Sequence, residues 1–323
     1  MLTRRELLVR ALGGAAALTL PPGFSGCRTW PDPAPAAGAW EPGRDAAATP
    51  PTDEDLRRLI AWVHVLRAER LNEAAAPMGR TAARVGELAI GTPYAAFTLE
   101  EYLRAGGSPF RTEPLQLDLT RFDCVSLVEA CLAVARLARR PGEPAWTGFA
   151  REMERMRYRG GQRAGYASRL HYFSEWIADG ERRGLLTDLG RELGGMPDRR
   201  PLRFMTSNPD AYPALGHAGM IEVIGDFERA LDGHPRWVIP TSRISEAEPQ
   251  LQTGDVLAFA TTIEGLDVTH AAFACRDEGG TLRVLHAPLS GGAVEITRST
   301  LTQYVQAIRR SSGILVARPH HAV

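Results

Sequence analysis

Lysine is absent from this sequence. All 38 basic residues among the 323 are arginines, and 38 acidic residues balance them, so the formal net charge is zero. Without lysine there is no P-loop lysine, no Schiff-base lysine and no Ser–Lys dyad, which excludes P-loop nucleotide hydrolases and lysine-dependent pyridoxal enzymes and aldolases. The balanced charge argues against a dedicated nucleic-acid-binding protein, because such proteins carry a basic surplus. Codon bias is the simplest explanation of the missing lysine.

Cysteine is scarce, with four residues, and no C-x-x-C pair occurs. The missing pair argues against a dithiol redox site and against a zinc ribbon. Cys124 and Cys131 lie on one predicted helix, roughly 10 Å apart at about 1.5 Å per residue. A disulfide tolerates at most about 7 Å between Cα atoms, so these two cannot pair with each other. We predict no metal and no cofactor, and we interpret Cys131 and Cys275 as small buried apolar residues.

The first 26 residues predict an export signal. Arg4 and Arg5 precede an apolar stretch from Ala11 to Leu20 that is too short to span a bilayer. The arginine pair is typical of a twin-arginine signal, which carries folded proteins across a membrane. Ser25-Gly26-Cys27 resembles the end of a lipobox, in which the cysteine is lipidated. We expect a periplasmic protein or a lipoprotein anchored through Cys27; a plain cleaved signal with an incidental cysteine is the alternative.

The remaining chain divides into a linker and one folded unit. Residues 27–51 are rich in proline and alanine and predict an extended linker. Residues 52–323 predict a single domain. We expect it to be catalytic, because it contains the candidate catalytic residues described below. Its parts are a helical entry portion over 52–110, a nucleophile helix and an arginine- and aromatic-rich segment over 111–200, and a sheet with histidines over 201–323.

Apolar periodicity predicts helices first and strands later, which indicates an α+β fold with a mostly antiparallel sheet. Helices are expected from 52 to about 66 and over 81–90, 98–103, 123–137, 145–157, 168–185 and 299–308. Strands are expected over 219–224, 237–240, 256–261, 269–276, 282–287, 293–297 and 313–318.

Cys124 is the candidate nucleophile. Asp123 is a favourable N-cap, which places Cys124 at the first position of a helix that is apolar on nearly every face and therefore buried. The unpaired backbone N–H groups and the positive end of the helix dipole at that position stabilise a thiolate. A cysteine at a helix start is more often structural, so the catalytic interpretation needs a base elsewhere in the chain.

His270 and His286 supply that base. They lie on two predicted strands joined by a turn at Asp277-Glu278-Gly279-Gly280. Because side chains alternate along a strand, the two imidazoles share a face only if the loop has an odd length or contains a bulge. A loop over 277–279 places the histidines opposite each other, and a loop over 278–280 makes them diagonal neighbours. We predict one of these, with Cys124 close to His270, as a nucleophile, base and orienting group.

These motifs resemble the NlpC/p60 cysteine peptidases, papain-like enzymes that cut bacterial peptidoglycan. The resemblance rests on Asp123-Cys124-Val125-Ser126, on Gly254-Asp255-Val256 before the strand of His270, and on His286 one strand later. The chain is more similar to one subfamily, formerly of unknown function and known for an N-acetylmuramoyl-L-alanine amidase. The motifs of that subfamily correspond to segments 91–94, 122–129, 158–160, 166–176 and 265–270.

The resemblance implies a papain-like NlpC/p60 fold, in which the buried helix carrying Cys124 packs on the sheet behind an extra N-terminal helical portion. It implies a triad of Cys124 as nucleophile, His270 as base and His286 as orienting group, acting through an acyl-enzyme without a metal. Tyr94 and Asp123 would lie beside the nucleophile and contact the substrate.

Arginines and aromatic residues interleave over 151–171. Nucleic-acid binding would use such a patch, but export and zero net charge argue against it. Arg159, Arg169 and His171 fall in the subfamily motif, and bidentate arginines would grip a carboxylate-rich muropeptide. Buried ion pairs to Glu129 or Glu175 are the competing interpretation.

The predicted function is a peptidoglycan hydrolase that cleaves the N-acetylmuramoyl-L-alanine amide bond of muropeptides. A γ-D-glutamyl-diamino acid endopeptidase of the same fold is one alternative. A papain-like lipid acyltransferase or thioesterase is another, and a non-catalytic wall-binding lipoprotein is a third.

Overall fold

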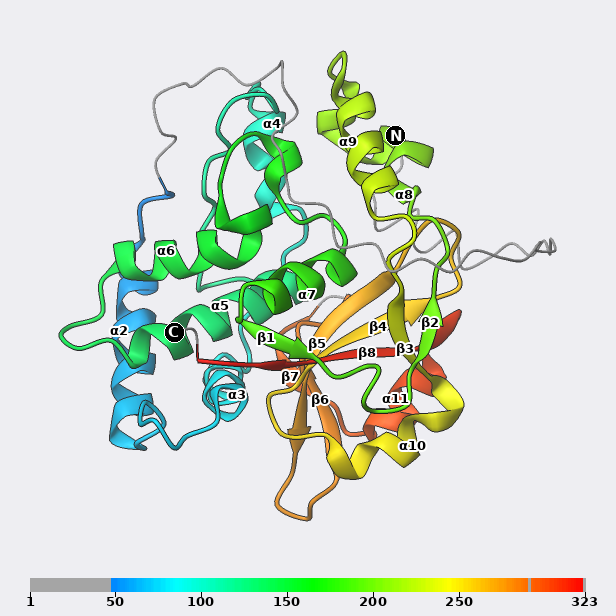
Figure 1. Ribbon diagram of the computed structural model, residues 1–323. Helices are drawn as coiled ribbons and strands as arrows, with labels where there is room; N and C mark the ends of the chain where they lie inside the picture. Colours follow the sequence, from blue (N-terminus) through cyan, green and yellow to red (C-terminus); the bar gives the residue numbers. More distant parts are fainter. Residues whose placement is uncertain (1–47, 290–291, 322–323) are drawn as a thin grey trace.

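The computed structural model describes residues 48–289 and 292–321 (Figure 1). The predicted export signal, Cys27 and nearly all of the predicted linker lie outside the described residues. Within them the α-helices are α2 (Asp53–Ala68), α3 (Met78–Leu88), α4 (Glu101–Arg104), α5 (Cys124–Ala138), α6 (Trp146–Arg157), α7 (Phe173–Arg182), α8 (Phe204–Ser207), α9 (Met220–Ala230), α10 (Ile244–Ala247) and α11 (Leu301–Ala307).

One sheet collects the strands. These are β1 (Leu186–Asp188), β2 (Met196–Asp198), β3 (Arg236–Pro240), β4 (Val256–Thr261), β5 (Val268–Arg276), β6 (Leu282–His286), β7 (Glu295–Ile296) and β8 (Ser311–Pro319). Their order is β2-β3-β8-β4-β5-β6-β7, with β1 also pairing with β8, and every pair is antiparallel. The predicted α+β class with a mostly antiparallel sheet is confirmed.

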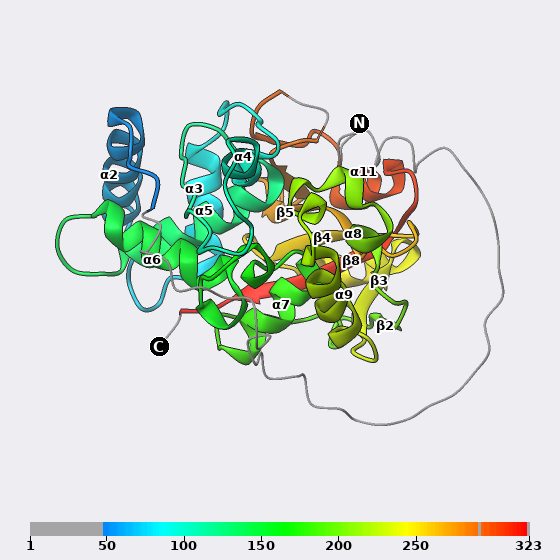
Figure 2. The ribbon, with the colours of Figure 1, turned by 90° about the horizontal axis from the view of Figure 1, so that it is seen from above.

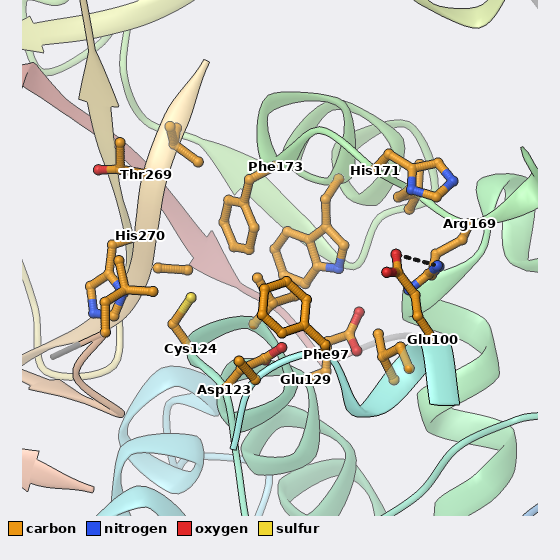
Figure 3. A pocket seen from close by; sticks show the side chains of 18 of the residues that line it. Phe97, Glu100, Asp123, Cys124, Glu129, Arg169, His171, Phe173, Thr269 and His270 are labelled. Carbon is orange, nitrogen blue, oxygen red and sulfur yellow. Dashed lines mark ion pairs between the residues drawn. The ribbon is translucent and has the colours of Figure 1, made fainter. Parts of the chain in front are cut away.

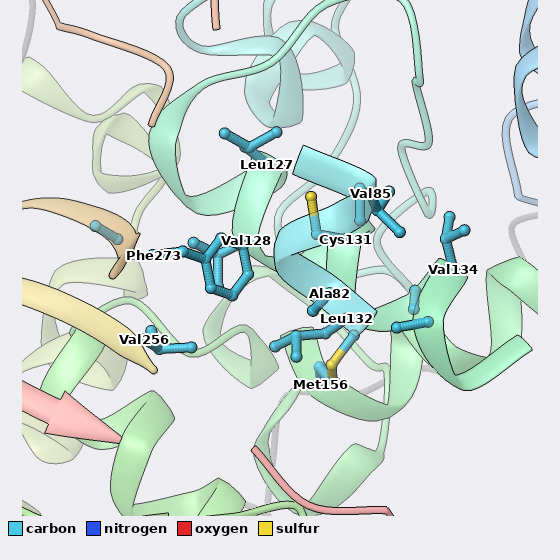
Figure 4. Close-up of a cluster of buried hydrophobic side chains, with 14 of the residues drawn as sticks. Ala82, Val85, Leu127, Val128, Cys131, Leu132, Val134, Met156, Val256 and Phe273 are labelled. Atoms are coloured by element: carbon cyan, nitrogen blue, oxygen red, sulfur yellow. The ribbon is translucent and has the colours of Figure 1, made fainter. Parts of the chain in front are cut away.

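Helix α5 lies at the centre of the larger core. Asp123 caps it: the Asp123 carboxylate accepts the N–H of Ser126 at 2.7 Å, and the Ser126 hydroxyl accepts the N–H of Asp123 at 2.9 Å. Leu127, Cys131 and Val134 recur at helical spacing on one face, and the adjacent face carries Val128 and Leu132, all of them buried (Figure 4). The helix contacts α2, α3, α6 and β5, so burial on several sides holds its first residue in place.

The sheet has a second core on its other face. There β4, β5, β6 and β8 pack against α10 and α11 in a cluster of sixteen buried apolar residues, to which β3 and nearby loops also contribute; Leu257, Ala272, Val284, Leu301 and Val316 belong to it. Figure 2 shows α2, α3 and α5 on one side of the molecule and α11 on the other. Because both faces of the sheet are covered, every residue of β4 is buried, and its sequence is apolar from Val256 to Ala260.

The β5–β6 hairpin confirms the predicted odd loop. Phe273 pairs with Leu285 and Arg276 with Leu282, which leaves residues 278–280 as a three-residue loop closed by the hydrogen bond from the N–H of Asp277 to the carbonyl of Thr281, at 3.0 Å. Gly280 supplies the left-handed conformation that such loops require, with φ at +78°. In this register His270 and His286 are diagonal neighbours on one face.

A β-bulge interrupts β5 immediately before His270. Phe259 of β4 pairs with His270 and Ala260 with Val268, so Thr269 has no counterpart on β4. A bulge bends its strand and redirects the neighbouring side chains. As a result Val268, Thr269, His270 and Ala271 all line one pocket, which an unbroken alternation of faces would not allow.

Two predicted elements are corrected. The expected strand over 219–224 is the start of α9, because its buried residues Met220, Ile224 and Glu228 recur at helical spacing. The expected helix over 168–185 begins only at Phe173, since Arg169 is extended and pairs with Tyr158 in an isolated bridge. The strands β1 and β2 were not predicted, because segments of three residues show no usable periodicity.

Candidate active site

One pocket of about 160 Å³ opens where the N-terminus of α5 meets β5. Cys124 and His270 lie at one end of it, and Glu100, Arg169 and His171 lie at the other (Figure 3). Phe97 and Phe173 lie between the two ends. Other aromatic and apolar side chains complete the lining, among them Trp176, Met205, Tyr212 and Leu289. The pocket therefore has a reactive end and a charged end.

Cys124 is the first residue of α5, as predicted from its N-cap. Its side chain lines the pocket and is 9% exposed. The other described cysteines differ in setting. Cys131 lies in the apolar core, where burial raises the pKa of its thiol, and burial also raises the pKa of the Cys275 thiol. Cys124 is the described cysteine that combines a helix start with access to the pocket.

His270 and His286 form a directly hydrogen-bonded pair. His270 Nε2 lies 2.8 Å from His286 Nδ1, and both side chains are buried. Burial, together with repulsion from His286, lowers the pKa of His270 well below its ordinary value. Burial lowers the pKa of His286 to about 4. Both imidazoles are therefore neutral near pH 7, which is the state that a general base requires.

Three residues not predicted from the sequence surround this pair. Phe259, opposite His270 across β4 and β5, stacks on it with ring centroids 5.6 Å apart and an angle of 11°. The Tyr304 hydroxyl of α11 lies 3.4 Å from His286 Nδ1, and the Glu295 carboxylate of β7 lies 3.6 Å from His286 Nε2. The histidine pair is enclosed on its far side by these groups.

The charged end centres on Arg169. Its Nη2 lies 3.6 Å from Glu100 and its Nε lies 3.4 Å from Glu113, within ion-pair range. Burial raises the pKa of Glu113 to about 7, although Arg169 and Arg157 oppose this shift. Arg169 Nε and Nη2 and the indole N–H of Trp176 have no hydrogen-bond partner among the described residues. These three buried donors on the lining residues therefore lack a well-aligned acceptor, although two of them face the carboxylates of Glu100 and Glu113.

A second buried ion pair, between Arg157 and Glu129, also lines the pocket. Arg157 Nε contacts Glu129 at 2.8 Å, and Arg157 Nη1 donates to the carbonyl of Gln116 at 2.6 Å. Burial raises the pKa of Glu129, and Arg157 opposes this shift. Glu129 was predicted as a partner for an arginine of the 151–171 segment, and here it pairs with Arg157, not with Arg159, Arg169 or His171.

The pocket brings together six of the eight predicted pocket residues: Tyr94, Asp123, Cys124, Arg169, His171 and His270. His286 lies behind His270 and does not line the pocket. Arg159 does not line it either, because it pairs with Glu175 at 2.6 Å and lies over the ring of Phe227 at 3.9 Å. Its prediction as a substrate contact has no support from this position, and the competing prediction of an ion pair to Glu175 is confirmed. The Asp123 carboxylate is engaged in capping α5.

Among the described residues, no group of histidine, cysteine, aspartate or glutamate side chains could hold a metal ion. No described helix has the length and apolar character needed to span a bilayer.

Comparison with known proteins identifies relatives. A family model named AmiA-like, described as N-acetylmuramoyl-L-alanine amidase-like, matches residues 84–314. A crystal structure of an N-acetylmuramoyl-L-alanine amidase from Bacteroides uniformis ATCC 8492 is 28% identical, with a TM-score of 0.68, over 75% of this chain and 99% of that one. A Bacteroides fragilis protein provisionally named a xylanase is 33% identical, with a TM-score of 0.65, over 72% of this chain and 98% of that one. No curated protein matches the chain.

A more distant structure shows the fold alone. It is a Legionella pneumophila protein of the family DUF1460, 18% identical with a TM-score of 0.58, over 83% of this chain and 95% of that one.

The predicted membership of the NlpC/p60 superfamily is wrong. The family match is to the AmiA-like model, and the structural neighbours include an amidase and a DUF1460 protein. A capped cysteine at a helix start and a histidine on a hairpin encode local geometry that unrelated hydrolases also adopt, so these motifs do not discriminate between families. The papain-like NlpC/p60 fold predicted with that membership is not confirmed beyond its α+β class.

Proposed function

The chain belongs to the AmiA-like family, and from that membership and the geometry of the pocket we propose that it is a peptidoglycan amidase in which Cys124 attacks the bond between N-acetylmuramic acid and L-alanine. The observation that carries the proposal is one pocket shared by a cysteine at a helix start and a neutral, buried histidine pair. The name of the Bacteroides uniformis relative supports the choice of bond. A cysteine on a buried helix facing a histidine on an antiparallel strand is also the arrangement of papain-like hydrolases.

In the proposed reaction the thiol proton of Cys124 moves to His270, and the sulfur attacks the carbonyl carbon of the scissile amide. Backbone N–H groups at the start of α5 bind the resulting oxyanion. His270 returns the proton to the alanine nitrogen, the carbon–nitrogen bond breaks, and the peptide leaves as an amine. The muramoyl group remains on sulfur as a thioester. A water molecule, deprotonated by His270, then hydrolyses the thioester and restores the thiol.

The walls and the charged end of the pocket support a role in holding substrate. Phe97, Phe173 and Trp176 offer flat apolar surfaces to sugar or methyl groups. Arg169 and the Trp176 indole offer buried N–H donors to a carbonyl or carboxylate. Tyr94 and His171 also line the pocket, and we propose that they contact substrate.

Xylan hydrolysis is not supported by the pocket. Glycosidases need two carboxyl groups placed on either side of the scissile bond. Asp123 caps α5, Glu129 is paired with Arg157, and Asp267 accepts the backbone N–H of Ser174 at 2.8 Å. Glu100, the remaining carboxylate of the lining, accepts the hydroxyl of Tyr166 at 3.1 Å and faces Arg169. Because all four carboxylates are engaged, we do not propose a glycosidase.

The alternatives from the sequence differ in the product that they predict. A γ-D-glutamyl-diamino acid endopeptidase would cut within the peptide, and an acyltransferase or thioesterase would act on an acyl ester. Mass analysis of muropeptides after digestion separates them: the proposed amidase releases an intact peptide that begins with L-alanine and a sugar with a free lactyl carboxylate. Release of a dipeptide, or of no peptide, would refute the proposed bond.

Cys124→Ala tests the nucleophile in the same assay. Release should stop while the thermal unfolding midpoint stays close to that of the wild type, because one sulfur at the pocket wall is removed. Cys275→Ala is the matched control and should retain activity, since Cys275 lies in the other half of β5, away from the pocket. An active Cys124→Ala protein would end the cysteine mechanism.

We further propose that residues 1–26 direct export, that Cys27 anchors the protein to the membrane, and that residues 52–323 form a single catalytic domain. Replacing Arg4 and Arg5 with lysine should leave precursor in the cytoplasm if the twin-arginine route is used. Palmitate labelling that disappears in Cys27→Ala would support the anchor. An unlabelled wild-type protein would exclude it.

A further inference from the structure

The histidine pair can exist in two proton arrangements, and only one of them provides a base. Each neutral imidazole has one N–H and one lone pair, and the 2.8 Å contact between His270 Nε2 and His286 Nδ1 needs one donor and one acceptor. If His270 Nε2 donates, His270 Nδ1 keeps its lone pair. If His286 Nδ1 donates, His270 Nδ1 carries the proton instead and cannot accept another. The question rests on the proposed function, because it concerns which nitrogen takes the thiol proton.

The free nitrogens of the pair are both buried. His270 Nδ1 and His286 Nε2 have no hydrogen-bond partner among the described residues. The choice between the two arrangements is therefore made by the groups around His286. Three polar groups face it: His270 from β5, Glu295 from β7 and Tyr304 from α11.

Glu295 favours the productive arrangement. Its carboxylate lies 3.6 Å from His286 Nε2, close enough to attract an N–H there and to repel a lone pair. The position follows from the sheet, because His286 and Glu295 are directly paired across β6 and β7 and their side chains share a face. A proton held on His286 Nε2 leaves a lone pair on Nδ1, which then accepts the N–H of His270 Nε2.

Tyr304 acts in the same direction from the other side. Its hydroxyl lies 3.4 Å from His286 Nδ1, where it can donate weakly to the lone pair that also accepts the shorter hydrogen bond from His270 Nε2. Burial, with smaller contributions from Cys124 and Glu295, raises the pKa of Tyr304 to about 12, so the hydroxyl keeps its proton. The ring also packs edge-on against His286 at 5.2 Å and contacts Phe259 at 5.4 Å, which holds both imidazole planes in place.

We propose that Glu295 and Tyr304 are positioning residues that hold the His270–His286 pair in the arrangement with a proton on His286 Nε2 and a lone pair on His270 Nδ1. Neither residue lines the pocket. When His270 accepts the thiol proton, its Nε2–H still donates to His286, and the Glu295 carboxylate stabilises the positive charge that spreads over the pair.

The first test is a ring-¹⁵N NMR spectrum of the substrate-free protein. The wild type should show His270 with a pyridine-type Nδ1 and His286 with a pyrrole-type Nε2. In Glu295→Ala the two nitrogens should exchange character in part of the population. Glu295→Gln should be intermediate, because the amide can accept from Nε2–H or donate to a lone pair. The histidine signals are assigned from His270→Gln and His286→Gln.

The second test is the pH dependence of Cys124 alkylation by iodoacetamide. With less lone pair on His270 Nδ1, Glu295→Ala and Tyr304→Phe should react more slowly near neutral pH, by roughly fivefold, the factor that corresponds to one net hydrogen bond. Their profiles should move to higher pH. Tyr304→Phe keeps the ring and its packing, so this change reports the hydroxyl. Glu278→Gln is the matched control, since it removes a carboxylate from the exposed loop at the far end of the β5–β6 hairpin.

Wild-type NMR signals and an unchanged alkylation profile in Glu295→Ala and Tyr304→Phe would overturn the proposal. A lower unfolding midpoint with an unchanged profile would show a structural role and would overturn it equally. Both measurements need no peptidoglycan, so a failure of the amidase proposal, seen as intact muropeptides with the wild type, is a separate outcome.

Discussion

The two ends of the pocket bury their ionisable groups in opposite ways. At the reactive end His270 and His286 are buried and both stay neutral. The carboxylate near them, that of Glu295, is exposed to solvent and does not compensate for their burial. At the charged end Arg169 is buried between the carboxyl groups of Glu100 and Glu113. Burial disfavours charge in both places, but only the second has partners that compensate. In the proposed mechanism the uncharged end moves a proton, and at the other end Arg169 keeps its charge whereas Glu113 holds its proton up to about pH 7.

Of the substitutions considered, His270→Ala should reduce activity most, because it removes the base at the reactive end. Removing the base of a nucleophile–base unit lowers kcat/KM by roughly 10⁴-fold or more. Release of peptide from muropeptides measures it, and the unfolding midpoint serves as the control for folding. Activity within about tenfold of the wild type would place the base elsewhere.

Arg169→Met should affect the charged end instead. Loss of hydrogen bonds from a charged donor to substrate should raise KM by roughly tenfold to a hundredfold, with little change in kcat. Trp176→Phe, which keeps the ring and removes one N–H, should raise KM by roughly fivefold. Arg151→Met removes an exposed arginine and is the control. A fall in kcat at constant KM would assign Arg169 to the chemical step and would blur the distinction between the two ends.

The two ends should also respond to pH with opposite signs. His286 has a pKa of about 4 against an ordinary 6.5, so the unfolded chain binds a proton that the folded one does not, and stability falls as pH drops below 6.5. Glu113 has a pKa of about 7 against 4.5, so the folded chain keeps a proton that the unfolded one loses, and stability falls as pH rises from 4.5 to 7.

Chemical denaturation at several pH values measures how the free energy of unfolding changes with pH. His286→Gln should reduce the loss of stability in acid, and Glu113→Gln should reduce the loss between pH 4.5 and 7. Changes in slope of the same sign in the two variants, each measured against the wild type, would contradict the contrast between the two ends.

Gly280→Ala should have the smallest effect and should leave both ends intact. The residue has φ at +78° with no atom within 4 Å of an added Cβ, so only backbone strain opposes the change. The expected cost is about 1 kcal/mol of unfolding free energy, measured by denaturation, with unchanged kcat and KM. Lower activity would mean that the hairpin register had shifted.

The sequence predicted the reactive end because its geometry is local. Asp123 caps Cys124 from the adjacent position, and His270 and His286 are joined by one short hairpin whose parity can be counted. The charged end, and the residues that contact His286 from other elements, could not be predicted in this way. Glu100, Glu113 and Arg169 meet only after three separate segments pack, and Glu295 and Tyr304 reach His286 from β7 and α11.

Two local errors have the same origin. Residues 219–224 are rich in β-branched side chains, and tertiary packing of Met220 and Ile224 selects a helix in spite of that composition. Arg159 was grouped with Arg169 because both fall in the subfamily motif, although Glu175 and Phe227, from other helices, hold it away from the pocket.

The loop over 278–280 also restricts which insertions and deletions this hairpin can accept. The loop is exposed, and exposed loop tips normally tolerate insertions and deletions. Here a change of one residue would alter the parity of the hairpin and turn either His270 or His286 to the opposite face, unless a compensating bulge arose. A change of two residues would preserve it. Relatives that retain the histidine pair should therefore differ in this loop by even numbers of residues, a pattern that an alignment of the family would reveal.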